Sequence, residues 1–196
     1  MSFANRASSK VFRDKLEIPV IQGGMGVGIS MGKLAGSVAA CGGMGVISTA
    51  LIGFREEDFY QNHVEADVRA LRKEIQIAKE IANGRGMIAI NAMTVTTDYR
   101  ECIEAAVREG IDAIISGAGL PLALPELVDG KDVLIAPIVS SAKAAALIMR
   151  SWNKKCERKP DFIVVEGSGA GGHLGFKKEE LINKSYQPLK IGRAHV

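Results

Sequence analysis

The chain contains little of several residue types on which particular classes of protein depend. Its three cysteines, Cys41, Cys102 and Cys156, are far apart and odd in number, so they match neither a zinc-ligand spacing nor a disulfide framework. We therefore expect reduced thiols and no metal site, with Cys41 and Cys102 buried on helices. Only 5% of the residues are aromatic, and none lies in the one basic cluster, residues 154–159. With a net charge of only +3, this pattern disfavours a nucleic-acid partner.

Long apolar runs are also missing. The longest uninterrupted run, residues 144–149, is far shorter than the roughly 20 residues that cross a membrane. The first 15 residues are polar and lack the apolar core of a secretory signal. We therefore expect a cytoplasmic protein without a membrane segment. The hydrophobic content of 47% and the charged content of 24% are typical of a globular protein, and 196 residues fit one domain.

One unit recurs along the chain: a short apolar strand, a loop containing glycine or small residues, and an amphipathic helix. Ser30, Thr97 or Asp98, and Ser140 or Ser141 are candidate helix caps. Repeated strand–helix units predict parallel strands joined by right-handed crossovers. The predicted strands occupy residues 18–22, 45–48, 87–91, 113–116, 133–139 and 162–165.

Two α/β architectures fit this repeat: a doubly wound open sheet and a (β/α)₈ TIM barrel. An open sheet concentrates its ligand loops at one switch point, whereas a barrel collects the loops after most strands at one rim. Glycine-containing loops follow the first, fourth and sixth predicted strands, at residues 23–28, 117–119 and 167–175. This distribution favours the barrel. Because a barrel needs eight strands and about 250 residues, we expect an incomplete one with about six of the eight strand–helix units.

The C-terminal tail continues no pattern. The last six residues, 191–196, match the translation of a common sequencing adapter. We therefore expect residues 1–190 to be the N-terminal three-quarters of a single barrel domain and residues 191–196 to be a non-native tail. His195 is accordingly left out of the functional candidates.

The sixth predicted strand ends in the stretch most suggestive of an active site. Five glycines lie within nine residues, 167–175, and His173 lies among them. Glycine allows a ligand to approach the backbone closely, and histidine titrates near physiological pH. The alternative is a tight turn with an exposed histidine. The stretch also matches G-x-G-x-x-G, but a dinucleotide fingerprint belongs to the first βαβ unit and is followed by an acidic residue, so NAD binding is disfavoured.

Two polar residues at strand ends carry open alternatives. Asn91 ends a buried strand and could form a local Asx turn or hydrogen-bond the edge of a heterocycle. Glu166 ends the sixth strand and could cap a neighbouring loop or contact a ligand. The glycines at 24, 26 and 28 could form a loose turn or lie flat against a planar ligand.

Taken together, five motifs resemble the nitronate monooxygenase family, formerly called 2-nitropropane dioxygenase. They occur in the family's order at residues 19–26, 42–47, 90–91, 116–121 and 166–175, and they cover nearly all of residues 17–176. The Ala-Gly-Gly-His-x-Gly element, 170–175, is the most specific. FMN-dependent enoyl-acyl-carrier-protein reductases are related and share the Gly-Gly-His-x-Gly part.

The resemblance implies FMN at the C-terminal rim of the barrel and a set of residues that contact it. His173 would be the catalytic base or would orient an anionic substrate. Glu166 stands where many family members have Gln, and Ser141 stands where a small hydroxyl residue is common. The residues that would bind the cofactor are Gly23, Gly24, Met25, Asn91, Ser141, Glu166, Gly171 and Gly172.

The function implied by the resemblance is oxidation of alkyl nitronates, such as propionate 3-nitronate, with O2 to a carbonyl compound and nitrite. Its partners would be the nitronate and O2, and a homodimer is one option for assembly. The alternatives are an FMN- and NAD(P)H-dependent enoyl reductase, against which Leu120 argues, and a non-catalytic flavin-binding module. We expect the 196-residue chain alone to be inactive. We also expect Met25, Asn91, Gly117 and His173 to converge in one cleft.

Overall fold

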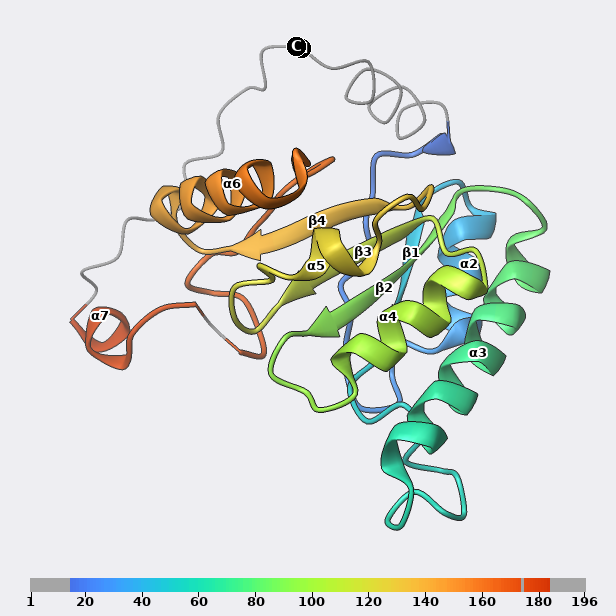
Figure 1. Cartoon of the computed structure of the whole chain (residues 1–196). Helices are drawn as coiled ribbons and strands as arrows, with labels where there is room; N and C mark the ends of the chain where they lie inside the picture. Colours follow the sequence, from blue (N-terminus) through green and yellow to red (C-terminus); the bar gives the residue numbers. More distant parts are fainter. Residues whose placement is uncertain (1–14, 174, 184–196) are drawn as a thin grey trace.

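Five parallel strands pair in the order in which they occur in the sequence, and helices run between them (Figure 1). The computed structural model describes residues 15–173 and 175–183. All four pairings within the sheet are parallel. The strands are β1 (Met44–Ser48), β2 (Met87–Met93), β3 (Ala113–Gly117), β4 (Leu134–Val139) and β5 (Val164–Val165).

The helices alternate with the strands, as the repeat in the sequence predicts. The longest is α3, with 20 residues, and α2 packs along it. The helices are α2 (Gly32–Ala40), α3 (His63–Ala82), α4 (Tyr99–Arg108), α5 (Leu124–Leu127), α6 (Ala142–Cys156) and α7 (Lys178–Ile182).

The two faces of the sheet have different coverings, and this distinguishes a barrel from a doubly wound sheet. Ile47, Ile90 and Ile114 point to one face, where they pack with helix residues such as Leu71 and Trp152. On the other face, alternate strand residues form a second buried cluster, which contains no helix residue in the described part of the chain. A doubly wound sheet carries helices on both faces. The protein therefore has the fold of an incomplete (β/α)₈ barrel, as the sequence predicts.

The first predicted strand, residues 18–22, lies beside β1 but forms only one isolated bridge, between Ile21 and Met44. Backbone bonds link Met44 N–H to the Val20 carbonyl at 2.9 Å and Gln22 N–H to the Met44 carbonyl at 3.0 Å. At one end the Val20 N–H donates to the Ile18 carbonyl at 2.7 Å. At the other end Gln22 bonds the Val46 backbone through its side chain, so the backbone ladder stays short. The six predicted strands are thus five strands and one bridged segment in the described residues, with that segment and β5 at the two edges of the sheet.

The prediction for Cys102 is confirmed and that for Cys41 is wrong. Cys102 is fully buried on α4, and burial together with the nearby Asp98 carboxylate raises the pKa of its thiol. Cys41 is exposed just after α2. The face of α2 that packs on α3 consists of glycine and alanine. The two helices are too close there for larger side chains, since a Cβ on Gly36 would lie 2.7 Å from the Ala78 carbonyl oxygen of α3. The glycine and alanine residues of α2 therefore pack against α3, and Cys41, which follows the helix, is exposed to solvent.

Of the candidate caps, Ser141 accepts the Ala144 N–H at 3.2 Å at the start of α6, as predicted. Ser30 does not cap α2, whose N-cap position is Met31. Instead its buried hydroxyl accepts hydrogen bonds from the Met25 N–H at 2.9 Å and from the Gln22 side chain at 2.8 Å. It also donates to the Gly23 carbonyl at 3.2 Å. Ser30 therefore holds the glycine loop that follows residues 18–22.

A buried carboxyl group lies between α3 and the loop that follows β1. Asp67 is 1% exposed and accepts the Gly53 N–H at 2.6 Å. Burial is the main cause that raises the pKa of Asp67 to about 6, and the neighbouring Asp98 carboxylate adds to it. The Gly53 N–H and His63 act in the opposite direction. Asp67 thus opposes folding in its charged form.

The fold should therefore lose stability as Asp67 ionises. From about pH 4 to about pH 6 the folded protein keeps a proton that the unfolded chain has released, so the free energy of unfolding falls as pH rises. Asp67→Asn keeps an acceptor for the Gly53 N–H and removes the titration. Urea unfolding gives the free energy of unfolding of this variant and of the native protein. We expect the difference in favour of the variant to be about 1–3 kcal/mol larger at pH 7 than at pH 4. Asp129→Asn, at an exposed site, is the control, and an equal gain at both pH values would contradict the assignment.

Ser30→Ala should destabilise the protein. It leaves the Met25 N–H without its side-chain acceptor and removes one of the three acceptors of the Gln22 amide nitrogen, at a cost of about 1–3 kcal/mol. Urea unfolding measures this loss. Ser37→Ala, which removes an exposed hydroxyl from α2, is the matched control and should change the free energy of unfolding little. Equal effects of the two substitutions would show that the Ser30 bonds add nothing to stability.

Candidate functional site

The loops after the strands enclose a cleft of about 470 Å³ at the C-terminal edge of the sheet, which we call the central cleft. Its lining includes Gly24 and Gly26 from the loop after residues 18–22, Asn91 of β2 and Gly117 of β3. The lining also includes Ile138 of β4, Glu166 and residues 171–173. Its volume lies within the range of about 300–1,000 Å³ that is usual for small-molecule sites.

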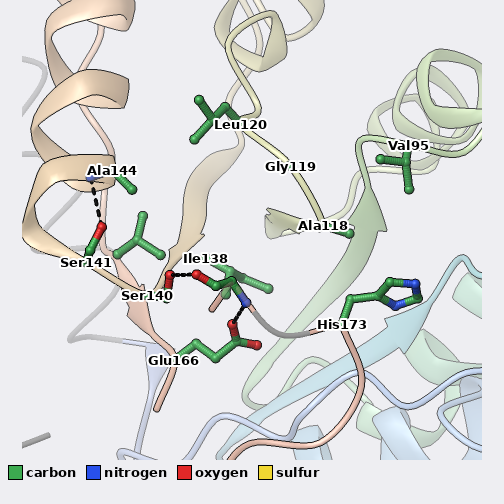
Figure 2. Close-up of a pocket in the computed structure, with 12 residues that line it drawn as sticks. Val95, Ala118, Gly119, Leu120, Ile138, Ser140, Ser141, Ala144, Glu166 and His173 are labelled. Atoms are coloured by element: carbon green, nitrogen blue, oxygen red, sulfur yellow. Dashed lines mark hydrogen bonds between the residues drawn. The ribbon is translucent and has the colours of Figure 1, made fainter. Parts of the chain in front are cut away.

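A second cleft of about 440 Å³ adjoins the first, and we call it the side cleft (Figure 2). It lies between the segment after β3, which carries Gly119 and Leu120, and the start of α6, which carries Ser141 and Ala144. Its apolar wall includes Val95, Leu120 and Ile138. Four residues line both clefts: Ala118, Ile138, Glu166 and His173.

Most of the site residues expected from the sequence lie around these two clefts. Those that line the central cleft are Gly24, Asn91, Glu166, Gly171, Gly172 and His173. Ser141 lines the side cleft. Gly23 and Met25 line neither, and Met25 is 46% exposed. Of the four residues expected to converge, Asn91, Gly117 and His173 therefore meet in one cleft and Met25 does not.

The loop geometry explains why Met25 stays outside. Its N–H donates to the Ser30 hydroxyl, and its carbonyl accepts the Ser30 N–H at 2.9 Å. Both backbone polar groups are thus engaged inside the loop. The neighbouring Gly24 turns towards the cleft instead, and a Cβ on it would lie 2.5 Å from the Asn91 Cβ.

The Asn91 side chain is available to a ligand. Its backbone carbonyl accepts the Thr49 N–H at 3.0 Å, which ties β2 to the end of β1. No group in residues 15–173 or 175–183 hydrogen-bonds its side-chain amide, although Asn91 is partly buried and lines the central cleft. An amide in this position offers donors and an acceptor to a planar polar edge. The Asx-turn alternative has no support in the described hydrogen bonds.

Glu166 acts on its own loop. Its Oε2 accepts the Gly175 N–H at 2.9 Å, and the Ser140 hydroxyl donates to the Gly175 carbonyl at 2.7 Å (Figure 2). The capping alternative for Glu166 is therefore seen in the structure, and the residue also lines both clefts. From the sequence, Ser140 was expected only as a candidate helix cap. A hydroxyl directly after a predicted strand was the one signal that could have indicated its role.

His173 lies where the two clefts join and is exposed. Gly172, directly before it, has φ of +86°, a conformation that favours glycine. Within the described residues no group hydrogen-bonds the imidazole ring, so the backbone of the loop determines where it lies. The linings contain one carboxylate, Glu166, and no lysine or arginine.

The site thus offers an apolar enclosure, one amide without a partner and one imidazole. These groups suit a planar ligand with a polar edge and a proton transfer at the junction of the clefts. No set of three or more His, Cys, Asp or Glu side chains in the described part of the chain is arranged to hold a metal ion. Among the described helices, none is both long and apolar enough to cross a membrane.

Two solved structures are similar to this chain in fold. FabK from Thermotoga maritima matches with a TM-score of 0.64 and 23% identity over 89% of this chain and 49% of that chain. Nitroalkane oxidase from Streptomyces ansochromogenes matches with a TM-score of 0.66 and 14% identity over 87% of this chain and 53% of that chain. The chain thus spans about half the length of either. No curated protein gives a significant match.

The sequence motifs and the fold agree with a comparison to protein families. The model of the family described as nitronate monooxygenase matches residues 9–189, which is nearly the whole chain. This match includes the strands, both clefts and the stretch around His173. The chain belongs to the nitronate monooxygenase family.

Proposed function

We propose that the protein is a flavin-dependent oxidoreductase that binds FMN in the central cleft and oxidises alkyl nitronates with O2 to a carbonyl compound and nitrite. Propionate 3-nitronate is the representative substrate. The observation that carries this proposal is the position of His173, which lines both the central cleft and the apolar side cleft. A cofactor in one cleft and a substrate in the other would meet at this residue.

The residues of the central cleft fit a flavin ring. The backbone at Gly24 packs closely on Asn91, because a Cβ there would lie 2.5 Å from the Asn91 Cβ. At Gly171, which also lines the cleft, an added Cβ would have no protein atom within 4 Å. Space at that position is open to a planar ligand. When bound, FMN would supply the electron transfer from the nitronate and the reaction with O2.

The chain's own residues would bind and orient the reactants. The Asn91 amide would hydrogen-bond the polar edge of the ring, and Gly171 and Gly172 would allow the ring to approach the backbone. Val95, Leu120 and Ile138 would pack against the alkyl part of the substrate in the side cleft. His173 would remove the α-proton from a neutral nitroalkane, or would orient a nitronate that is already an anion.

The phosphate of FMN has no cationic partner among the residues that line these clefts. In TIM barrels a phosphate commonly binds at the loops after the seventh and eighth strands. We propose that residues 1–190 are part of one FMN-binding barrel domain whose phosphate site lies outside the two clefts. The length of the chain, about half that of the solved structures it matches, supports this proposal.

The activity is tested by oxygen consumption with FMN added. We expect O2 uptake and nitrite release with propionate 3-nitronate. Oxidation of NADH with a crotonyl thioester, without nitronate-dependent O2 uptake, would instead support the enoyl reductase alternative. The assay needs the complete barrel as well as the 196-residue chain, because the proposed phosphate site lies outside the clefts.

The role of His173 is tested by the choice of substrate. His173→Ala should lower kcat/KM for a neutral nitroalkane by about 10²–10⁴-fold, because a positioned general base contributes about that much. The loss on pre-formed nitronate should be much smaller, since no proton has to be removed. Steady-state nitrite release measures both values. Equal losses on the two substrates would assign His173 an electrostatic role instead.

The flavin affinity of the chain should be insensitive to the phosphate. Because the cleft linings contain no lysine or arginine, FMN and riboflavin should bind the 196-residue chain with dissociation constants within about fivefold of each other. Quenching of flavin fluorescence measures both constants. Asn91→Ala should weaken both flavins equally, by about fivefold to tenfold for one neutral hydrogen bond. FMN that binds a hundredfold more tightly than riboflavin would place a phosphate site within this chain.

A further inference from the structure

Both polar groups of the Gly175 backbone are held by side chains from two neighbouring strand ends. The Glu166 carboxylate accepts the Gly175 N–H at 2.9 Å, and the Ser140 hydroxyl donates to the Gly175 carbonyl at 2.7 Å (Figure 2). Glu166 directly follows β5 and Ser140 directly follows β4. The glycine stretch that begins after Glu166 is therefore fastened at its far end to the sheet.

The fastening is close and leaves room only for glycine. A Cβ on Gly175 would lie 2.5 Å from the Ser140 hydroxyl oxygen and 3.5 Å from Glu166 Oε2. The backbones that carry the two side chains are joined, because the Glu166 N–H donates to the carbonyl of Val139, the residue directly before Ser140, at 2.8 Å. The three residues form a unit that we call the Gly175 clamp: Ser140, Glu166 and Gly175.

His173 lies two positions before Gly175, and the conformation of the loop backbone determines where its imidazole ring lies. The side chain has no hydrogen-bond partner in the described residues. The stretch from Gly167 contains one short internal bond, from the Ala170 N–H to the Gly167 carbonyl at 3.0 Å. Glycine-rich backbone of this kind has many accessible conformations and loses more entropy on ordering than other sequences.

We propose that Glu166 and Ser140 are positioning residues, which act through the Gly175 clamp to hold His173 at the junction of the two clefts. Neither needs to touch the flavin or the substrate to do so. The catalytic consequence rests on the function proposed above, whereas the clamp itself does not.

Hydrogen exchange tests the clamp without any cofactor or activity. In the 196-residue chain, Glu166→Ala should speed exchange of the Gly175 amide, followed by NMR, by about tenfold, the factor expected for one charge-assisted hydrogen bond at an exposed site. Glu166→Gln keeps an acceptor oxygen and should retain most of the protection. Ser140→Ala should speed exchange at Gly175 by a smaller factor.

Two controls accompany the exchange measurement. The Ala170 amide, bonded only within the loop, should exchange at the same rate in all variants. Ser168→Ala removes a hydroxyl from the same stretch without touching Gly175 and should leave the Gly175 amide unchanged. Unchanged exchange at Gly175 in Glu166→Ala would overturn the clamp.

A double-mutant cycle tests the positioning role in the complete protein with FMN. Glu166→Ala alone should lower kcat on a neutral nitroalkane by about tenfold to a hundredfold, as misplaced catalytic groups do. In the His173→Ala background the same substitution should cause little further loss, because its effect passes through His173. Glu166→Gln should restore most of the activity.

The two measurements separate the proposals. Equal losses from Glu166→Ala with and without His173 would overturn the positioning role, even if Gly175 exchange confirmed the clamp. If no variant of the complete protein, including the native one, oxidised a nitronate or a nitroalkane, the proposed function would be wrong. Altered Gly175 exchange would then still establish the clamp as a structural feature of the loop.

Discussion

Parallel pairing of the strands in chain order is the constraint on which the site depends. It places the carboxyl end of every strand at one edge of the sheet, so residues distant in sequence, such as Gly24 and His173, line one cleft. The described helices follow the strands in Figure 1, but none of their residues lines the central cleft, which is formed by strand ends and loops. The site is thus a consequence of the fold before any single side chain is considered.

The glycines of the site serve two different purposes. At Gly24 and Gly117 an added Cβ would meet the neighbouring strand end, at 2.5 Å from Asn91 and 3.0 Å from Ile138 respectively. There glycine allows one backbone to pack closely on another element. At Gly23 and Gly171 the added Cβ would meet no protein atom within 4 Å. Of these four glycines, only Gly171 both has open space beside it and lines the central cleft.

The sequence predicted the fold well because its signals are local. Apolar runs separated by glycine loops gave the barrel and nearly all strand positions, and the density of glycine around His173 indicated the site. The errors concern features set by distant contacts. Cys41 is exposed because α2 packs on α3 through its smallest residues. Residues 18–22 form a single bridge because Gln22 bonds the Val46 backbone through its side chain. Neither packing choice is visible within one segment.

Ser140 and Met25 show the same limit at the level of the site. The role of Ser140 arises from a contact with Gly175, 35 positions away in the sequence. Met25 was expected in the cleft, but its backbone is engaged by Ser30 within the same loop. Motifs indicate which loops line a site. They do not indicate which way each residue turns, because this depends on hydrogen bonds between loops.

The Gly175 clamp also addresses an electrostatic difficulty. The proposed nitronate substrate is an anion, and Glu166 lines both clefts without a lysine or arginine among the other lining residues. Two like charges about 4 Å apart repel by about 1 kcal/mol in bulk water and by about 4 kcal/mol near a protein surface. The Gly175 N–H, bonded to Oε2, offsets part of this charge and turns that oxygen towards the loop. An amide at this position would relieve the repulsion but would form a weaker bond to Gly175. A carboxylate at position 166 is therefore compatible with an anionic substrate only while the Gly175 N–H is hydrogen-bonded to it.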